Sequence, residues 1–346
     1  MREEDFSQRL LDWFGREGRA LPWREKRSLY GTVVSEFMLQ QTQVKTVLPY
    51  YARWMATFPG FRELAEAEEE AVLAAWAGLG YYSRAKNLQR LARELVRRGE
   101  PPVEVGEWQQ LPGIGPYTAA AVVSMVFGGR VAVVDGNVVR VLSRFFGIRE
   151  VFAAGNSRPK SIVALAERLL DADRPGEYNE ALMDLGATIC TPRKPRCLLC
   201  PLKETCAVGG GPEAEELPRL ERVKTVELEA SRLCWIQDGR IWLRRREGGR
   251  RLLGMYELPE LAEGVKGRGA NLILKRRRGI SNQRILEHLY CFFGYNAPDE
   301  EMVGEGEWLS LAGLDSFPVV GPHRRWIGEL RQQAEGGGPA EARKLS

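Results

Sequence analysis

The fold is decided by a glycine-rich stretch in the first half of the chain, Leu111-Pro112-Gly113-Ile114-Gly115-Pro116-Tyr117-Thr118-Ala119, followed by an apolar run to about Phe127. The two glycines predict a tight turn, and the apolar run predicts a helix directly after it. Bare glycines let a ligand approach the backbone, and the amides at a helix N-terminus attract anions. The stretch therefore predicts a phosphate site, although a Gly-x-Gly pair alone is more typical of an ordinary interhelix turn.

A carboxylate follows this turn about twenty residues later, at the end of Val131-Ala132-Val133-Val134-Asp135-Gly136-Asn137-Val138. Its position after an apolar segment predicts that Asp135 caps the next helix. Taken alone, Asp135 fits a cap better than a catalytic group.

The remainder of the first half has the spacing of helices. Apolar residues recur at helical intervals up to residue 206, with almost no strand-like alternation, which predicts an all-α domain over residues 1–206. Residues 207–222 contain Gly209-Gly210-Gly211-Pro212 followed by acidic residues. This composition predicts a flexible linker that does not pack.

The second half has a different pattern. Short alternating segments on either side of Asp238-Gly239 predict a β-hairpin. We therefore expect an α+β domain over residues 223–335. Residues 336–346 have no apolar pattern that would order them, which predicts a disordered tail.

Composition limits the class of protein. The chain has 346 residues, with 50 Lys and Arg against 46 Asp and Glu, and 44% of the residues are hydrophobic. This excludes a disordered chain, and the length predicts two domains. The net charge of +4 is too small to identify a polyanionic partner, so any basic surface must be local. No apolar run approaches the roughly 18 residues of a membrane span. We expect a soluble, cytoplasmic monomer without a membrane partner.

Four cysteines form a second motif. Cys190, Cys197, Cys200 and Cys206 have the spacing C-x6-C-x2-C-x5-C. Four thiolates within 17 residues can surround one metal centre, and prolines between them shape the loop. Unrelated buried thiols seldom cluster in this way. The spacing predicts a metal-binding loop at 190–206 and leaves zinc and an iron–sulfur cluster both open.

These motifs together resemble the adenine DNA glycosylase family of the helix-hairpin-helix, iron–sulfur DNA glycosylases, over nearly all of residues 6–206. A phosphate-type turn followed by a carboxylate is the arrangement of that superfamily. The other segments that carry the resemblance are Leu21-Pro22-Trp23-Arg24, Ser35-Glu36-Phe37-Met38-Leu39-Gln40-Gln41-Thr42, Gly78-Leu79-Gly80-Tyr81-Tyr82-Ser83-Arg84, Met183-Asp184-Leu185-Gly186-Ala187 and the four cysteines.

The resemblance implies a catalytic centre. Glu36 matches the general acid that protonates N7 of a flipped-out adenine, and Asp135 matches the carboxylate that stabilises the positively charged sugar. Glycoside cleavage of this kind needs one protonated and one ionised carboxyl, so the buried one should have the raised pKa. Tyr117 and Asn137 lie beside the carboxylate in the family. Endonuclease III-like relatives carry a nucleophilic lysine at the position of Tyr117, so we expect no lyase activity.

The resemblance also implies contacts to adenine and DNA. Arg24, Leu39 and Glu180 would surround the adenine, although Leu39 also fits a plain core role and Glu180 a surface role. Gln41 and Tyr81 match wedge side chains that fill the gap left by a flipped base. Outside its motif, Tyr81 would be interpreted as a packed aromatic. The further DNA-contact residues are Thr42, Gly113 and Gly115.

The same resemblance implies a cofactor and a second domain. The cysteines would hold a 4Fe–4S cluster in a loop that helps to grip DNA. Residues 223 to about 330 resemble, more loosely, a Nudix-like domain that recognises 8-oxoguanine, but no Glu-rich hydrolase box is present. Where the family places Phe-Ser-His, this chain has Ile280-Ser281-Asn282. We expect Ser281 and Asn282 to contact the opposite base, since an amide can replace part of the imidazole's hydrogen bonding. The basic run at 275–278 predicts phosphate contacts.

The sequence thus predicts an all-α helix-hairpin-helix glycosylase domain with an iron–sulfur loop, joined to an α+β Nudix-like domain. We expect a monofunctional base-excision repair enzyme acting on duplex DNA that contains adenine mispaired with 8-oxoguanine or guanine. A thymine glycosylase acting on G·T mismatches is the alternative, against which Glu36 and the second domain argue. A lesion-binding protein without turnover is the other, and intact Glu36 and Asp135 argue against it.

Overall fold

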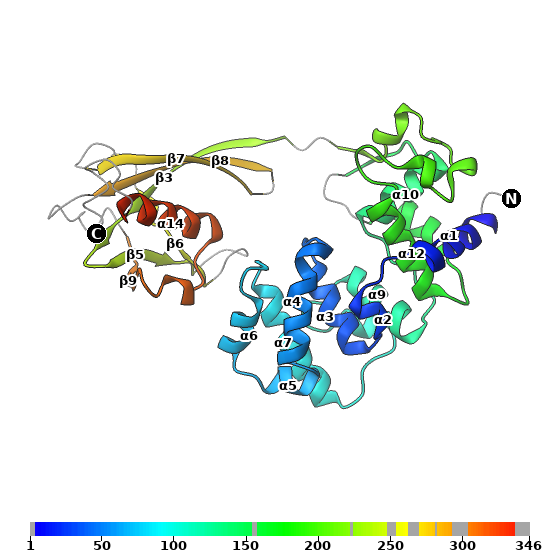
Figure 1. Ribbon diagram of the computed structural model, residues 1–346, viewed down its shortest axis with the longest axis horizontal. Coiled ribbons are helices and arrows are strands. Elements are labelled where there is room, and N and C mark those ends of the chain that lie inside the picture. Colours follow the sequence, from blue (N-terminus) through cyan, green and yellow to red (C-terminus); the bar gives the residue numbers. More distant parts are fainter. Residues whose placement is uncertain are drawn as a thin grey trace. The chain divides into compact units, whose positions relative to one another are not determined.

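The structure is a computed structural model, and it divides into two compact units, Met1–Arg222 and Val223–Ser346 (Figure 1). Residue 223 is the predicted start of the second domain. The predicted tail at 336–346 lies outside the described residues. The structure describes residues 4–153, 158–221, 224–247, 254–261, 270–280, 282–292 and 304–335.

The first unit is built from helices, which confirms the predicted fold class. Its apolar residues recur at the helical spacing seen in the sequence, and the predicted helix after the glycine turn runs to Phe127. None of the helices in the described part of the chain combines the length and apolar character needed to cross a bilayer. The helices are α1 (Glu4–Glu17), α2 (Pro22–Glu25), α3 (Leu29–Leu39), α4 (Val44–Thr57), α5 (Phe61–Glu66), α6 (Glu69–Trp76), α7 (Ser83–Arg98), α8 (Val105–Trp108), α9 (Pro116–Phe127), α10 (Gly136–Phe146), α11 (Lys160–Leu169) and α12 (Pro175–Thr188).

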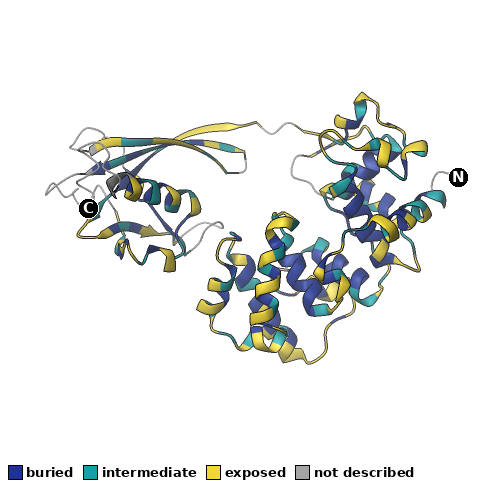
Figure 2. Cartoon of the chain, viewed as in Figure 1, coloured by how far each residue is buried: buried dark blue, intermediate teal, exposed yellow. Residues whose placement is uncertain are grey.

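Two hydrophobic cores lie within this unit. The first joins α3, α4, α6, α7 and α9 around Trp54 and Trp76, whose rings pack edge to face at 5.3 Å. The second joins α1, α10, α11 and α12 around Phe6 and Tyr178. Helix α9 of the first core contacts α12 of the second, and Figure 2 shows α3 and α9 as largely buried. Side chains from both cores therefore meet between them.

The segment predicted to be a flexible linker packs against the first unit, so that prediction is wrong for residues 207–221. Val208, Ala214 and Leu217 form a small buried cluster. A short 3-10 helix (η3, Pro212–Glu215) and strand β2 (Arg219–Leu220) follow, and β2 pairs in parallel with β1 (Val151–Phe152). Composition did not reveal this because three apolar side chains among glycines are enough to anchor a short segment when a surface is available.

The second unit is α+β, as predicted. Its three-stranded sheet has the order β3-β8-β7, with β3 parallel and β7 antiparallel to β8, and its four-stranded sheet joins β4, β5, β6 and β9. The predicted hairpin is confirmed: β4 and β5 are antiparallel, and Asp238 and Gly239 have φ of 50° and 68°. The strands are β3 (Val226–Cys234), β4 (Ile236–Gln237), β5 (Arg240–Arg245), β6 (Tyr256–Glu257), β7 (Ala270–Ile280), β8 (Gln283–Phe292) and β9 (Glu307–Ser310), and the helix is α14 (Gly321–Glu335).

Candidate active site

Glu36 is a buried carboxyl in the middle of α3. Ser28 caps this helix by accepting a hydrogen bond from the Gly31 amide at 3.0 Å. Most residues of α3 are buried, so its one carboxyl enters the protein interior and is only 6% exposed. Its Oε2 has no hydrogen-bond partner in the described part of the chain. Burial raises the pKa of Glu36 to about 7, and the nearby charges of Asp135 and Glu180 add to the effect.

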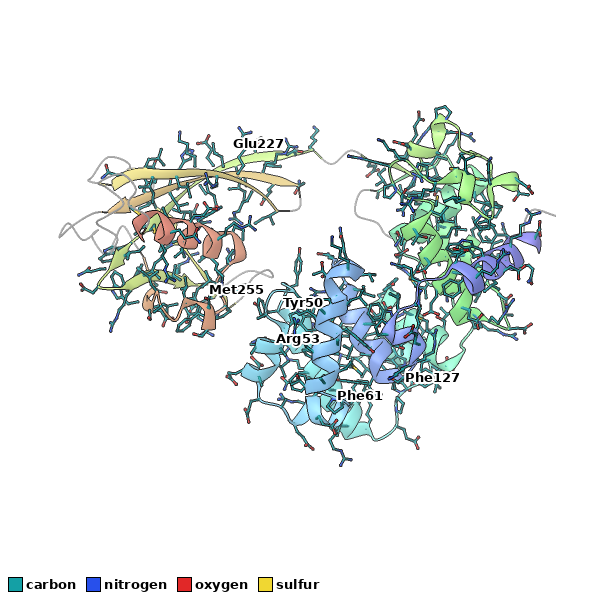
Figure 3. The ribbon with its side chains drawn as sticks, viewed as in Figure 1. Tyr50, Arg53, Phe61, Phe127, Glu227 and Met255 are labelled. Carbon is teal, nitrogen blue, oxygen red and sulfur yellow. The ribbon has the colours of Figure 1, made fainter. Side chains whose placement is uncertain are left out.

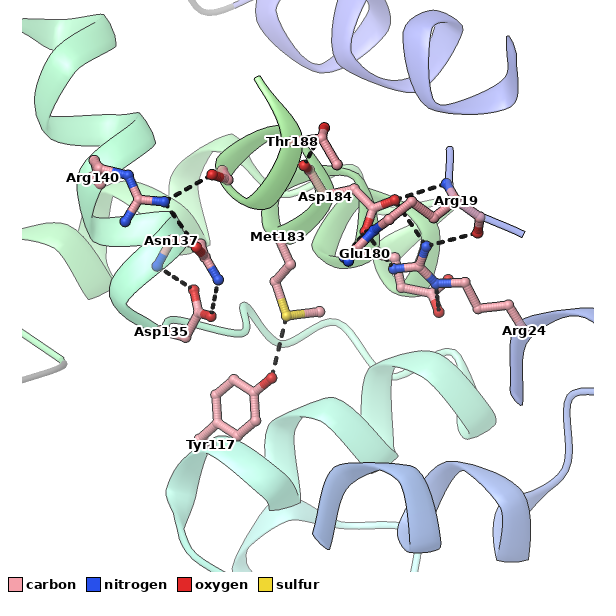
Figure 4. Close-up of polar contacts among 11 residues, drawn as sticks. Arg19, Arg24, Tyr117, Asp135, Asn137, Arg140, Glu180, Met183, Asp184 and Thr188 are labelled. Atoms are coloured by element: carbon pink, nitrogen blue, oxygen red, sulfur yellow. Dashed lines mark hydrogen bonds and ion pairs between the residues drawn. The ribbon is translucent and has the colours of Figure 1, made fainter. Parts of the chain in front are cut away.

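Asp135 has the opposite environment. It caps α10, as predicted: Oδ1 accepts hydrogen bonds from the amides of Asn137 and Val138, both at 2.8 Å. Its Oδ2 accepts from Asn137 Nδ2 at 2.8 Å (Figure 4). Three donors and the positive end of the helix dipole therefore face this carboxyl. The site holds one buried carboxyl that favours its proton and one carboxyl that accepts three hydrogen bonds.

Tyr117 lies on the first turn of α9 and interacts electrostatically with both carboxyls. Its hydroxyl donates to Met183 Sδ at 3.2 Å (Figure 4). It is also near enough to Glu36 to oppose the rise in the pKa of that carboxyl. Burial raises the pKa of Tyr117 well above its ordinary value, and the charges of Glu36 and Asp135 raise it further. The phenol stays neutral, so it acts as a hydrogen-bond donor.

An ion-pair network forms another wall of the site. Glu180 of α12 is buried, which excludes the surface role that the sequence left open. It accepts from Arg24 Nε at 3.1 Å and from Arg27 Nη2 at 2.6 Å. Asp184, one turn further on, accepts from Arg24 at 2.9 and 3.0 Å and from Arg19 (Figure 4). Burial alone would raise the pKa of Asp184, but these hydrogen bonds outweigh it and hold that pKa below its ordinary value.

The glycine turn has the geometry that its sequence predicted. Gly113 has φ of 76°, and a Cβ there would lie 2.7 Å from Asn87 Cβ and 2.9 Å from the Phe37 ring. Gly115 precedes Pro116, with which α9 begins. The Tyr117 and Thr118 amides belong to the first turn and have no intrahelical acceptor. The turn can therefore present free amides to a phosphate.

The two predicted wedge residues share an unusual backbone conformation. Gln41 and Tyr81 have φ of 57° and 49°, and both are exposed, Tyr81 to 62%. Left-handed backbone at non-glycine residues costs energy and is often found at functional positions. The packed-aromatic interpretation of Tyr81 is excluded. The preceding turn closes tightly under α4, since a Cβ at Gly78 would collide with the hydroxyl of Tyr50, a residue labelled in Figure 3.

Arg84 holds together the two predicted wedge turns, which are the turns at Gln41 and Tyr81. The sequence had not suggested this role for Arg84. Its buried Nη1 donates to the carbonyls of Phe37, Met38 and Gln40 at 2.7–2.9 Å. Its Nη2 donates to Leu79 O and Gly80 O, and to Thr42 Oγ1 at 3.3 Å. Thr42 therefore accepts a hydrogen bond that helps to hold the turn at Gln41. Leu39 is half-buried and packs on the first core. The sequence feature that could have predicted this role is the arginine at the end of the Gly-Leu-Gly-Tyr-Tyr-Ser-Arg motif.

The four cysteines line one small cavity in the loop that packs against α10. A Cβ at Gly210 would lie 3.1 Å from Cys197 Cβ, so the loop closes here because Gly210 has no side chain. No three His, Cys, Asp or Glu side chains of the described residues are gathered to hold a single ion. Burial raises the pKa of Cys190, and that of Cys200 to about 12. The donor set is sulfur only and surrounds a space, and both an iron–sulfur cluster and a tetrahedral zinc ion accept four sulfur ligands.

Two arginines of α10 connect this loop with the catalytic centre. Arg140 donates to Asn137 Oδ1 at 2.8 Å and to Cys190 O at 2.7 Å. Arg144 donates to Thr191 O at 2.7 Å and lies 3.5 Å from Cys190 Sγ. The positions of the loop and of the Asp135–Asn137 pair are therefore linked through one helix face.

The predicted lesion loop joins β7 and β8 in the second unit. Ser281 lies outside the described residues. Asn282 is exposed, and its Nδ2 donates to Lys224 O at 3.2 Å, which leaves its side-chain oxygen available. The basic run before it is only partly available for phosphates, because Arg276 pairs with Glu329 at 3.0 Å and Arg278 with buried Glu287 at 2.8 Å.

Comparison with known proteins gives consistent results. Residues 34–169 match the HhH-GPD superfamily base excision DNA repair protein model. The human adenine DNA glycosylase is 45% identical over 93% of this chain and 70% of its own length, and the rat protein is 44% identical over 61% and 45%. A solved structure of a thermostable thymine-DNA glycosylase is 30% identical, with a TM-score of 0.54, over 60% of this chain and 96% of that one.

Proposed function

The chain belongs to the adenine DNA glycosylase family, and from this premise we propose that it hydrolyses the N-glycosidic bond of adenine mispaired with 8-oxoguanine or guanine in duplex DNA. The observation that carries the proposal is the pair of unlike carboxyls, Glu36 buried with a pKa of about 7 and Asp135 hydrogen-bonded to three donors. The human relative covers both units of the chain, which supports adenine as the base.

The two carboxyls divide the chemistry between them. Protonated Glu36 can deliver its proton to N7 of a flipped-out adenine, which makes the base a neutral leaving group. The C1′–N9 bond then breaks, and the sugar carries a positive charge that the Asp135 carboxylate stabilises. Water adds to C1′ and loses a proton, leaving an abasic site. Asn137 and the helix amides keep Asp135 oriented throughout by hydrogen bonds.

Adenine selection falls to the other wall of the pocket. Glu180 accepts hydrogen bonds from Arg24 and Arg27, and a carboxylate can also accept from the exocyclic amino group of adenine. Asp184 fixes the Arg24 guanidinium in one orientation. Thymine has no amino group, so this acceptor favours adenine over the alternative substrate.

The absence of an amine at the turn supports hydrolysis without strand cleavage. Residues 111–127 contain no lysine, and the position that would carry it is the buried phenol of Tyr117. A Schiff base needs a primary amine at C1′. We infer a monofunctional enzyme.

Cys190, Cys197, Cys200 and Cys206 would hold the 4Fe–4S cluster of the family. When bound, it would cross-link a loop that has little secondary structure, and the link would stabilise folding rather than take part in turnover. Iron and sulfide analysis of anaerobically purified protein distinguishes it from zinc. In the second unit, we propose that the loop between β7 and β8 contacts the opposite base through the Asn282 oxygen.

A single-turnover excision assay tests the proposal on duplexes with A opposite 8-oxoguanine, A opposite G, and T opposite G, each analysed with and without alkali. We expect adenine release opposite 8-oxoguanine, with strand breaks only after alkali. Thymine release as the main reaction would refute the substrate, and breaks without alkali would refute the monofunctional chemistry. Equal excision by wild type and Asp135→Asn would refute the enzyme assignment.

A further inference from the structure

Helix α7 carries a row of arginines that the catalytic centre does not use. Arg90, Arg93 and Arg97 recur three and four residues apart, so they share one face of the helix, and Arg98 directly follows Arg97 at its C-terminal end. All four are exposed, whereas the opposite face of α7 is buried in the first core. This arrangement is a solvent-facing cationic strip on a fixed support.

The strip borders a cavity that reaches the glycine turn. The cavity has a volume of about 500 Å³ and is lined by the four arginines, Glu94, and Gln110, Leu111 and Pro112. Pro112 directly precedes Gly113 of the glycine turn, and Gly113 packs against Asn87 of α7. The arginine strip therefore continues the surface of the glycine turn, whose amides at Tyr117 and Thr118 are free.

The guanidinium groups are oriented but not neutralised. Glu94 is the only carboxylate among the lining residues, and it binds Arg97 through Nε and Nη2 at 3.0 and 2.7 Å and Arg98 through Nε at 2.9 Å. Arg93 donates Nε to Ala65 O at 3.0 Å. Among the described residues no hydrogen bond uses the Nη nitrogens of Arg90, Arg93 or Arg98. Among the lining residues four cations face one anion, and Glu69, which pairs with Lys86 at 2.5 Å, is a further carboxylate near Arg90 and Arg93. The free Nη donors favour an external acceptor.

We propose that this strip binds the phosphates of duplex DNA next to the nucleotide that binds at the glycine turn. Arg90 and Arg98 are eight residues apart, about 12 Å along a helix axis. One DNA strand carries a phosphate every 3.4 Å of duplex axis, so the strip spans about three phosphates. Guanidinium groups suit phosphate because they donate two hydrogen bonds in a plane.

Because the arginine strip is continuous with the glycine turn, its ligand is DNA and not an acidic protein segment. The proposal rests on the proposed function, since that function places a phosphate at the amides of Tyr117 and Thr118. A strand that leaves this point along α7 meets the strip directly, whereas a protein partner would have to share the cavity with the DNA. The strip adds affinity without sequence preference, because phosphates are present at every step.

The test is the salt dependence of binding to an undamaged duplex, measured by fluorescence anisotropy with full-length protein. Arg90→Gln/Arg93→Gln removes two cations that do not pair with Glu94. The matched control, Arg16→Gln/Arg130→Gln, removes two exposed arginines elsewhere. Arg130 lies beyond the C-terminal end of α9, at the opposite end of this helix from the glycine turn. Each phosphate contact contributes about 0.9 to the slope of log K against log salt.

We expect the α7 variant to lower this slope by about 1.8 and to raise Kd roughly 10- to 100-fold at 0.1 M salt, with the control near wild type. Arg90→Lys/Arg93→Lys should keep most of the slope, and Glu94→Gln should tighten binding. Equal slopes for the α7 variant and wild type, or equal losses in the two double variants, would overturn the proposal. The excision rate of wild type at saturating enzyme tests the proposed function separately, because a failed strip leaves that rate unchanged.

Discussion

Replacing Glu36 with Gln should separate stability from activity in a pH-dependent way. The substitution keeps the size of the side chain but removes the titrating group. The pKa of the folded carboxyl is about 7 against an ordinary 4.5, a difference of about 2.5 units. At 1.36 kcal/mol per unit, ionising Glu36 in the folded state costs about 3 kcal/mol.

The sign follows from which state binds the proton more tightly. The folded protein retains the proton up to about pH 7, whereas the unfolded chain releases it near 4.5. The wild type therefore loses stability as pH rises from about 4.5 through about 7, and Gln at this position does not. Linkage with these two values gives a loss of about 1 kcal/mol at pH 5.5 and about 3 kcal/mol at pH 8.5.

Urea unfolding of the full-length proteins measures this difference, followed by far-ultraviolet circular dichroism because most helices lie in the first unit. We expect the stability of Glu36→Gln relative to wild type to increase by about 2 kcal/mol between pH 5.5 and pH 8.5. Glu66→Gln on α5, which replaces an exposed carboxyl, should show no such change.

Activity should change in the opposite direction. Gln cannot deliver a proton, so we expect single-turnover excision to fall about 100- to 10,000-fold at both pH values. In the wild type the rate should decline as pH rises through about 7. A stability difference that stays flat with pH, or that narrows as pH rises, would show that Glu36 is not held protonated by burial and would refute the reasoning.

Asp135→Asn keeps an acceptor at the N-cap, so thermal unfolding should change little while excision falls at least about 100-fold; Asp135→Ala should in addition lose about 1 kcal/mol of stability. Cys200→Ser should lose most of the iron and sulfide found in anaerobically purified wild type, whereas Cys234→Ser, a buried thiol of the second unit, should retain both; equal metal contents would contradict the cluster assignment. Tyr81→Ala should change stability by less than about 0.5 kcal/mol, because the ring is 62% exposed, yet slow excision from duplex DNA, and an unchanged rate would remove Tyr81 from the wedge. Arg84→Lys leaves several carbonyls of both wedge turns without a donor and should cost about 1–3 kcal/mol in urea unfolding, together with slower excision.

Much of the fold followed from local patterns. The glycine turn, the helix to Phe127 and the Asp135 cap depend on residues within a few positions of one another. The hairpin at Asp238-Gly239 is equally local, because two residues that accept positive φ determine the turn. The linker prediction failed since it used composition alone, whereas the docking of residues 207–221 depends on a surface made by distant segments.

By itself, the sequence determined the helical and α+β classes of the two units, the capped carboxylate and the set of four sulfur donors, because spacing along the chain encodes each of them. Only the tertiary structure decided that Glu36 is near enough to Asp135, about a hundred residues away, for their charges to interact, and that it is buried enough to keep its proton. It also decided that Glu180 is internal and that one arginine holds both wedge turns. The physical reason is that desolvation and long-range Coulomb interactions depend on which helix faces meet, and a local pattern shows which face is apolar but not what covers it.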